Sequence, residues 1–222
     1  MDDTLYDEID YCRSAFTATA KYIVDNLHSP EQMTTEAVFM ALWTQFNTGN
    51  QKKTFNTALE KFEIPYDAKT IKTLVSVYRE HTPTIDLPAD SRAVLDALSP
   101  KYRMAMLTDG FLPAQQLKAA ALGIEKYFEY IVFTEQLGRE FWKPSPVGFK
   151  KILKKFAEKP ENCIYIGDNA EKDFIAPNQL GMHTIQLIRE KRVHKAQPDS
   201  EMAVPKQKID AITMLPPVLE EL

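Results

Sequence analysis

The stretch Cys163-Ile164-Tyr165-Ile166-Gly167-Asp168-Asn169 decides the class of fold. It begins with a short apolar run that suits a buried strand, and it ends in Gly-Asp-Asn, a common turn sequence. A run with helical character, residues 172–180, follows and is ended by Gly181. A strand, a turn and a helix in this order form the repeating unit of a parallel sheet flanked by helices.

The same unit recurs on both sides of this stretch, and short apolar strands alternate with helices from about residue 85 onward. The expected strands and helices are 102–107, 130–133, 183–187 and 90–98, 113–122, 146–156. The polar tail 191–208 is expected to be a loop, after which residues 209–222 return to pack on the core. We therefore predict an α/β fold in which residues 85–222 form a Rossmann-like parallel sheet core flanked by helices.

Residues 6–84 differ from the rest of the chain in the spacing of their apolar residues. Apolar side chains such as Phe16, Leu42 and Leu74 recur at helical spacing in this stretch, and no strand is evident. We predict an all-helical cap domain over residues 6–84. It is inserted between residues 1–5, a remnant of the first core motif, and the α/β core.

Composition excludes several functions. The chain has 222 residues, of which 27 are basic and 31 acidic, so its formal net charge is −4 and no basic face is expected for a nucleic-acid partner. No apolar stretch approaches the ~20 residues that cross a bilayer, so no membrane partner is expected. Two cysteines build no disulfide framework. We expect a cytoplasmic protein that acts on something small, and the oligomeric state is left open.

Polar residues stand where strands are expected to end, at the edge where open α/β sheets bind ligands. Thr108-Asp109-Gly110 ends one strand, and Asp168 ends another, with Asp173 five residues later. Lys143 precedes a proline in the connection between them. Each of these residues alone can be explained without a function, because threonine caps helices, Gly-Asp-Asn forms ordinary turns and lysine is usually solvated.

Taken together, these residues make a chemical set. A hydroxyl group and backbone amides can hold phosphate oxygens, and a lysine can neutralise developing charge. A pair of carboxylates can hold a hard divalent cation such as Mg²⁺. Their order and spacing match a fourth segment at the start of the chain, Met1-Asp2-Asp3-Thr4-Leu5-Tyr6.

These four segments resemble the four motifs of the haloacid-dehalogenase-like hydrolase superfamily. The family's first motif is Asp-x-Asp-x-Thr, its second a Ser or Thr that ends a strand, its third a Lys, and its fourth an Asp pair after Gly. An all-helical insertion directly after the first motif is the cap of one subclass, and residues 6–81 fit it. The resemblance covers nearly the whole chain and implies phosphoryl transfer through a covalent aspartyl-phosphate with Mg²⁺ as cofactor.

The resemblance implies how the acid and the metal are held. Asp2 would protonate the leaving oxygen and later activate water, and its backbone carbonyl would ligate the metal. Thr4 would brace the loop. Asp168 would hold Mg²⁺, and Asp173 would support it directly or through water. The true dehalogenases lack an acid at the position of Asp2 and need no metal, so the pair Asp2 and Asp168 favours phosphate chemistry.

The resemblance also implies a phosphate site and a substrate class. Thr108, with the backbone amides of Asp109 and Gly110, would bind the transferring phosphoryl group. Lys143 would offset charge on the nucleophile and on the phosphoryl oxygens. The substrate would be a small phosphorylated metabolite, such as a nucleotide or a sugar phosphate.

The cap of such enzymes contacts the leaving group of the substrate. Tyr6 and Trp43 are therefore candidates for substrate contact. For Trp43 the competing interpretation is that it fills the apolar core of the cap itself, because it recurs at helical spacing with its apolar neighbours.

The chain departs from the family pattern in one place. The attacking aspartate should stand two residues before Asp2, and Met1 occupies the position between them, so neither the nucleophile nor the strand that carries it is in this sequence. We expect a truncated or misassigned start, a core without its first central strand, and no turnover by the chain as given. The alternatives are a non-catalytic pseudophosphatase that binds a phosphorylated ligand or a protein partner, and a sugar phosphomutase.

Overall fold

The computed structural model describes residues 1–27, 33–48 and 51–222. These residues form two compact units, which we call the helical unit (residues 10–85) and the α/β core (residues 1–9 and 86–222). The sequence predicts a cap over residues 6–84 and a core from residue 85. The units divide close to those positions, between Ile9 and Asp10 and between Ile85 and Asp86.

The helical unit is built on apolar residues at helical spacing. In its first helix Cys12, Phe16, Ala20 and Ile23 are buried on one face, and they pack in one apolar cluster with residues of the later helices. The fourth helix begins at a capping box in which the carboxylate of Asp67 accepts a hydrogen bond from the following turn. The helices are α1 (Glu8–Asn26), α2 (Thr35–Thr48), α3 (Thr54–Lys61) and α4 (Ala68–Glu80).

The α/β core alternates helices and short strands, as the sequence predicts. The exception is the strand β5, which lies in a tail that the sequence predicts to be a loop. The elements are α5 (Ala89–Leu98), β1 (Ala105–Thr108), α6 (Ala114–Leu122), β2 (Tyr130–Phe133), α7 (Val147–Phe156), β3 (Ile164–Gly167), α8 (Ile175–Leu180), β4 (His183–Leu187), β5 (Gln207–Ile209) and α9 (Leu215–Glu220).

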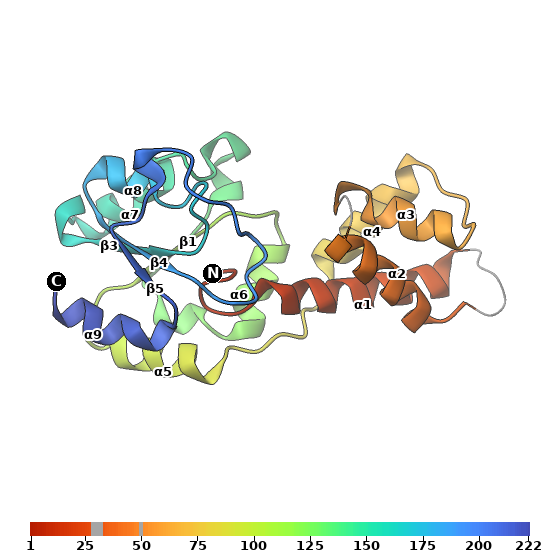
Figure 1. The fold of residues 1–222 in the computed structure, drawn as a ribbon, viewed down its shortest axis with the longest axis horizontal. Helices are drawn as coiled ribbons and strands as arrows, with labels where there is room; N and C mark the ends of the chain where they lie inside the picture. The colour runs from red at the N-terminus through yellow and green to blue at the C-terminus, as the bar shows by residue number, and fades with distance from the viewer. Residues whose placement is uncertain (28–32, 49–50) are drawn as a thin grey trace. The chain divides into compact units, whose positions relative to one another are not determined.

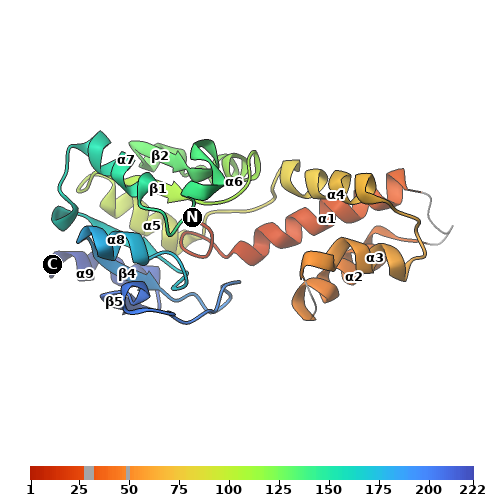
Figure 2. The ribbon, with the colours of Figure 1, turned by 90° about the horizontal axis from the view of Figure 1, so that it is seen from above.

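All strand pairs of the core are parallel, which confirms the predicted α/β class with a parallel arrangement. They form two sheets in the described residues, β1 with β2 and β3-β4-β5, so β1 and β3 each have one hydrogen-bonded neighbour. Helices α7 and α8 lie on one side of the strands and α5 and α9 on the other (Figure 1), and Figure 2 shows the strands from above. The carboxyl ends of β1 and β3 carry the residues that the sequence predicts to be functional.

One apolar cluster joins the two sheets. It includes Leu107 of β1, Val132 of β2 and Met182 before β4, together with Phe149 of α7. Gly148 lets α7 approach β1, because a Cβ atom at this position would overlap the side chain of Leu107. The apolar cluster therefore fixes the position of the strand end that carries Thr108.

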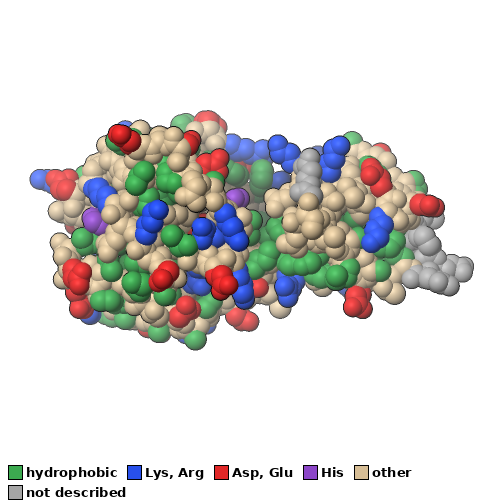
Figure 3. Space-filling view, in the orientation of Figure 1, with side chains coloured by type: hydrophobic (Ala, Val, Ile, Leu, Met, Phe, Trp, Pro, Cys, Tyr) green, Lys and Arg blue, Asp and Glu red, His purple; other side chains and the backbone are tan. Residues whose placement is uncertain are grey.

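The end of the chain returns to the core as expected, with Ile209, Ile212 and Leu215 buried. None of the helices in the described residues is both long enough and apolar enough to cross a membrane. On the face drawn in Figure 3, acidic and basic side chains occur on each unit.

Candidate active site

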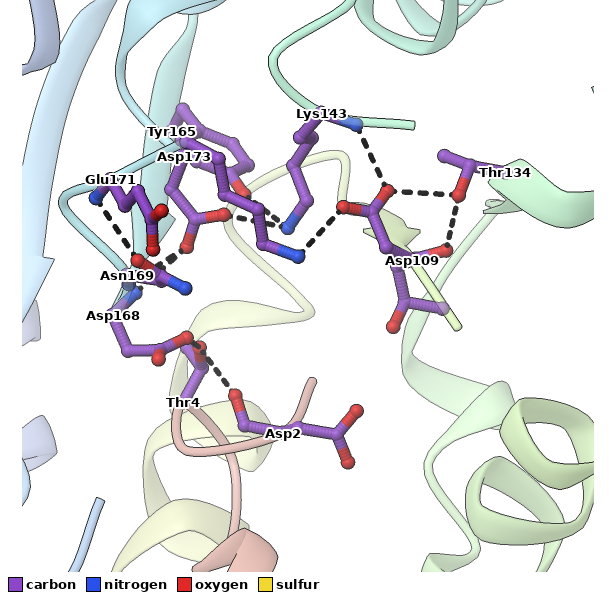
Figure 4. A network of polar contacts seen from close by, with 12 residues as sticks. Asp2, Thr4, Asp109, Thr134, Lys143, Tyr165, Asp168, Asn169, Glu171 and Asp173 are labelled. Carbon is purple, nitrogen blue, oxygen red and sulfur yellow. Dashed lines mark hydrogen bonds and ion pairs between the residues drawn. The ribbon is translucent and has the colours of Figure 1, made fainter. Parts of the chain in front are cut away.

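The segment Asp2-Asp3-Thr4 lies against the carboxyl ends of the core strands. The hydroxyl of Thr4 is within hydrogen-bond distance of two oxygens, the backbone carbonyl of Asp2 (3.3 Å) and Oδ1 of Asp168 (3.2 Å) (Figure 4). Asp3 fastens the segment from its other side, because its carboxylate accepts hydrogen bonds from the backbone N–H groups of Glu8 and Val193. Arg189 adds donors to the carbonyls of Thr4 and Leu5.

Three donors hold the carboxylate of Asp2. Lys118 Nζ lies 2.9 Å from Oδ1, the hydroxyl of Tyr6 donates to the same oxygen over 2.6 Å, and Gln115 Nε2 donates to Oδ2 over 2.8 Å. Burial by itself would raise the pKa of Asp2, but the ammonium group of Lys118 and the two hydrogen bonds bring this pKa below its usual range. Asp2 is therefore held in its ionised form.

Lys118 and Gln115 are site residues that the sequence did not predict. Both lie on α6, and both are nearly fully buried, with 4% and 2% of their surfaces exposed. Lys118 also lies 3.7 Å from the carboxylate of Glu8, whose pKa is raised to about 7 by burial first and then by the charge of Asp2. Helical spacing could have indicated that both residues are buried, because Gln115 and Lys118 share the helix face of Ala114, Ala119 and Leu122.

Thr108 ends β1 and is buried, and Gln115 Nε2 donates to its hydroxyl over 3.1 Å. The same amide group donates to the backbone carbonyl of Asp109. Gly110 follows with a φ of 140°, and a Cβ atom there would come within 2.7 Å of the side chain of Gln115. Glycine is therefore required for this turn to close over Gln115.

The carboxylate of Asp109 joins several loops. It accepts hydrogen bonds from the hydroxyl of Thr134 (2.8 Å) and from the backbone N–H of Lys143 (3.2 Å), and Lys172 Nζ lies 3.1 Å away (Figure 4). The sequence predicts only its backbone amide as functional. Its side chain holds together the loops that follow β1, β2 and β3.

Lys143 points to the loop after β3. Its ammonium group lies 2.8 Å from Oδ1 of Asp173 and 3.3 Å from the hydroxyl of Tyr165. Burial would lower the pKa of Lys143, but Asp173 and the other acidic groups around it raise this pKa well above its ordinary value. Lys143 is therefore a fixed positive charge at the carboxyl ends of the strands.

The structure shows the partners of the Asp173 carboxylate. Its Oδ1 is paired with Lys143, and its Oδ2 accepts the backbone N–H groups of Asp168 and Asn169 over 3.1 and 3.0 Å. Both oxygens are thus engaged in holding the loop and the lysine. In the part of the chain that the structure describes, no three acidic, histidine or cysteine side chains converge on a metal position. The predicted metal-holding roles of Asp2, through its backbone carbonyl, and of Asp168 and Asp173 stay predictions.

Asp168 remains a suitable ligand for a cation. It is 8% exposed, and among the described residues no ion pair reaches its carboxylate, whereas Asp2, Asp109 and Asp173 each face a lysine. Burial, followed by the charge of Asp173, raises the pKa of Asp168 to about 7. Because Thr4 brings the carbonyl of Asp2 to the same place, two oxygens of the kinds that Mg²⁺ accepts are available together, and Mg²⁺ usually keeps several of its waters.

The two candidate substrate contacts, Tyr6 and Trp43, are both packed within the unit to which each belongs. Tyr6 is 1% exposed and its hydroxyl is bonded to Asp2, so its ring is part of the packing around the acid. Trp43 packs against the apolar cluster of the helical unit, where it stacks on Phe39 and Phe46 with ring centroids 5.7 and 6.0 Å apart. These contacts agree with the competing interpretation of Trp43, and its contact with a substrate stays a prediction.

Comparisons with known proteins agree with this geometry. A family model for haloacid dehalogenase-like hydrolases matches residues 1–181. The glyceraldehyde 3-phosphate phosphatase of Methanocaldococcus jannaschii is 26% identical over 198 residues, 86% of this chain and 83% of that protein. The protein of the same name from Methanopyrus kandleri is 32% identical over 121 residues, 54% of this chain and 51% of that protein.

Solved structures show the same fold. The hydrolase YfnB from Bacillus subtilis, in a form bound to magnesium, matches with a TM-score of 0.68 and 18% sequence identity. The match covers 99% of this chain and 95% of that chain. At this identity the likeness concerns the fold.

Proposed function

Because the chain belongs to the haloacid dehalogenase-like hydrolases, we propose that it is a Mg²⁺-dependent phosphatase of a small phosphorylated metabolite. The observation that carries this proposal is a continuous network of polar contacts that joins the four motif segments at the carboxyl ends of the strands. In order, the network runs Thr108–Gln115–Asp2–Thr4–Asp168–Asp173–Lys143. Buried polar residues of such different types are seldom assembled without a ligand to recognise.

In this proposal the phosphoryl group is bound at the end of β1. The hydroxyl of Thr108 and the backbone amides of Asp109 and Gly110 supply hydrogen bonds to its oxygens. Lys143 supplies a positive charge that remains at neutral pH, because the carboxylate of Asp173 holds the ammonium group and raises its pKa against the opposing effect of burial. Preorganised donors and charges of this kind stabilise the charge that develops during phosphoryl transfer.

Asp2 is proposed to handle the proton. Lys118 and the hydrogen bonds to Asp2 lower the pKa of its carboxyl group and so favour the ionised form, which accepts a proton from an attacking water. Lys118 and Gln115 keep both of its oxygens in place. The attacking carboxylate itself belongs to a position before Met1 and is assigned by the resemblance.

Mg²⁺ is proposed to be held by the carboxylate of Asp168 and the backbone carbonyl of Asp2. When bound there, the cation would neutralise charge on the phosphoryl oxygens. The cation would also supply a positive partner for Asp168, whose carboxylate makes no ion pair with a described residue, while Asp173 would act on the metal only through the loop that it holds.

The substrate is proposed from the relatives. Since the two relatives described above are named glyceraldehyde 3-phosphate phosphatases, a short sugar phosphate such as glyceraldehyde 3-phosphate is the first compound to test. Nucleotide monophosphates form the comparison set.

The test uses two forms of the protein. The 222-residue chain is expected to release no phosphate above background. A form extended at its N-terminus by an apolar strand and an aspartate two residues before Asp2 is expected to release phosphate in a Mg²⁺-dependent reaction. The matched control carries asparagine in place of that aspartate and is expected to lose activity by several orders of magnitude.

Each other outcome points to a different function. Robust Mg²⁺-dependent turnover by the 222-residue chain contradicts the aspartyl-phosphate mechanism. Phosphate binding without turnover in the extended form indicates a pseudophosphatase. Retention of the phosphate on the product indicates a phosphomutase.

A further inference from the structure

Lys172 reaches from one sheet of the α/β core to the other. It lies in the loop after β3, directly before Asp173, where its backbone N–H donates to the carbonyl of Asn169 over 3.3 Å. Its ammonium group lies 3.1 Å from Oδ2 of Asp109, the residue that follows β1. Lys172 therefore places a positive charge beside the turn that is proposed to bind the phosphoryl group.

The three lysines of the site differ in exposure. The side chains of Lys118 and Lys143 are 5% and 9% exposed, whereas that of Lys172 is 33% exposed. Lys143 already lies against Asp173 and Tyr165. An ammonium group has three N–H donors, and the contact with Asp109 uses one of those of Lys172. Lys172 is thus the most exposed lysine of this group and has N–H donors to offer to an incoming anion.

Lys172 binds Asp109 through Oδ2, whereas Oδ1 of Asp109 has two other donors. Its carboxylate also accepts the hydroxyl of Thr134 and the backbone N–H of Lys143, and the side chain is only 4% exposed. A partly exposed lysine pair contributes little to stability compared with a buried one. A bridge between loops therefore explains this lysine poorly, and a ligand contact explains both its exposure and its position.

We infer that Lys172 is a substrate-contacting residue, a second lysine that binds the phosphoryl oxygens together with Lys143. This inference rests on the proposed phosphate site at Thr108. It assigns an anion contact to a residue between the two aspartates of the fourth motif, at a position for which the resemblance implies no role. Lys172 would move its ammonium group from Oδ2 of Asp109 toward the ligand, and Oδ1 of Asp109 would keep its two donors.

The test is the binding of inorganic phosphate to the 222-residue chain in the presence of Mg²⁺, measured by isothermal titration calorimetry. Lys172→Met is expected to weaken binding about tenfold or more, because a hydrogen bond to a charged group is lost. Lys172→Arg, which keeps the charge, is expected to restore most of the affinity. Lys151→Met, an exposed lysine on α7, is the matched control and is expected to change nothing. Thermal unfolding of each variant shows whether it is folded.

Asp109→Asn separates ligand binding from bridging. It removes the same ion pair as Lys172→Met but leaves the lysine available, so we expect tighter phosphate binding. Equal weakening by Asp109→Asn and Lys172→Met would overturn the inference, because only the bridge would then matter. Unchanged binding by Lys172→Met would also overturn it.

Thr108→Val distinguishes a failure of the inference about Lys172 from a failure of the proposed phosphate site. If Thr108→Val abolishes phosphate binding while Lys172→Met does not, the inference about Lys172 fails and the proposed phosphate site stands. If the unmodified chain binds no phosphate at millimolar concentration, both are overturned.

Discussion

In the helical unit the buried polar side chains among the described residues are two threonines, whereas the α/β core buries aspartates, a lysine, glutamines and an asparagine. Thr19 and Thr54 satisfy their hydroxyls on carbonyls three or four residues earlier in the chain. The core instead pairs Asp2 with Lys118, and Thr4 with Asp168, across more than a hundred residues of sequence. The helical unit is held by apolar packing, and the core holds charge away from water.

This difference indicates where function lies. Buried charges cost free energy unless they are paired, so they are kept mainly where a site uses them. Phe16 lies in an aromatic cluster, with four neighbouring rings at centroid distances of 5.1–6.4 Å. Ring packing of this kind carries no cost of burying a charge. The two units should therefore respond differently to mutation, pH and salt.

The largest expected effect is that of Lys118→Met in the core. The change leaves the carboxylates of Asp2 and Glu8 without their shared cation in a buried position, and we expect a loss of about 3–5 kcal/mol of unfolding free energy. The matched control is Lys21→Met in the helical unit, where the pair with Asp25 is exposed, and its effect should stay within about 0.5 kcal/mol. Urea unfolding at neutral pH measures both. Similar losses of unfolding free energy in the two variants would contradict the conclusion that the core, unlike the helical unit, depends on buried charge pairs.

The next effect concerns pH. The folded pKa of Glu8 is about 7 and its ordinary value is 4.5, so between these values the folded chain holds a proton that the unfolded chain has released. Stability contributed by this group is therefore present below about pH 4.5 and is lost as pH rises through 7. We expect Glu8→Gln to gain up to about 3 kcal/mol relative to the unmodified chain between pH 4.5 and pH 8.

Urea unfolding at several pH values checks the sign. Asp168, whose pKa is also about 7, contributes a slope in the same direction, so part of the pH dependence should survive in Glu8→Gln. A Glu8→Gln variant that loses stability relative to the unmodified chain as pH rises would show that Glu8 is ionised in the folded protein.

The smallest effect is expected for Phe16→Leu in the helical unit. The substitution keeps an apolar side chain but removes the edge-to-face ring contacts, so we expect a loss of about 1–2 kcal/mol. Because no buried charge is involved, this loss should be the same at pH 5 and pH 8 and in low and high salt. A strong dependence on either would show that the helical unit is not held by apolar packing alone.

The strand ends of the core could be predicted because each strand is a short apolar run followed by a distinctive polar residue. Thr108 and Asp168 lie at the ends of β1 and β3 for this reason, and Lys143 lies in the connection between them. The strand β5 could not be predicted, since residues 207–209 form a strand only through their pairing with β4. Local sequence contains no sign of a partner twenty residues away.

The hydrogen-bond and ion-pair partners of the predicted residues are harder to predict from sequence than their positions at the strand ends. Lys118 and Gln115 look like ordinary helix residues until α6 is packed, although their place on its buried face was a signal. For Asp173, spacing after Asp168 indicated a carboxylate near the site, but it could not show that the carboxylate would turn to Lys143 and to two backbone amides. A side chain's partner depends on packing that spacing alone does not specify.

The long reach of the Asp2–Thr4 contacts has a consequence for how the chain folds. Besides Tyr6 and Glu8, this segment has partners 113 to 190 residues later in the sequence, on α6, in the loop after β3 and in the segment after β4. During synthesis the segment therefore emerges long before the residues that hold it, and it cannot be ordered until nearly the whole chain has been made. This segment is therefore ordered only after segments that are synthesised much later.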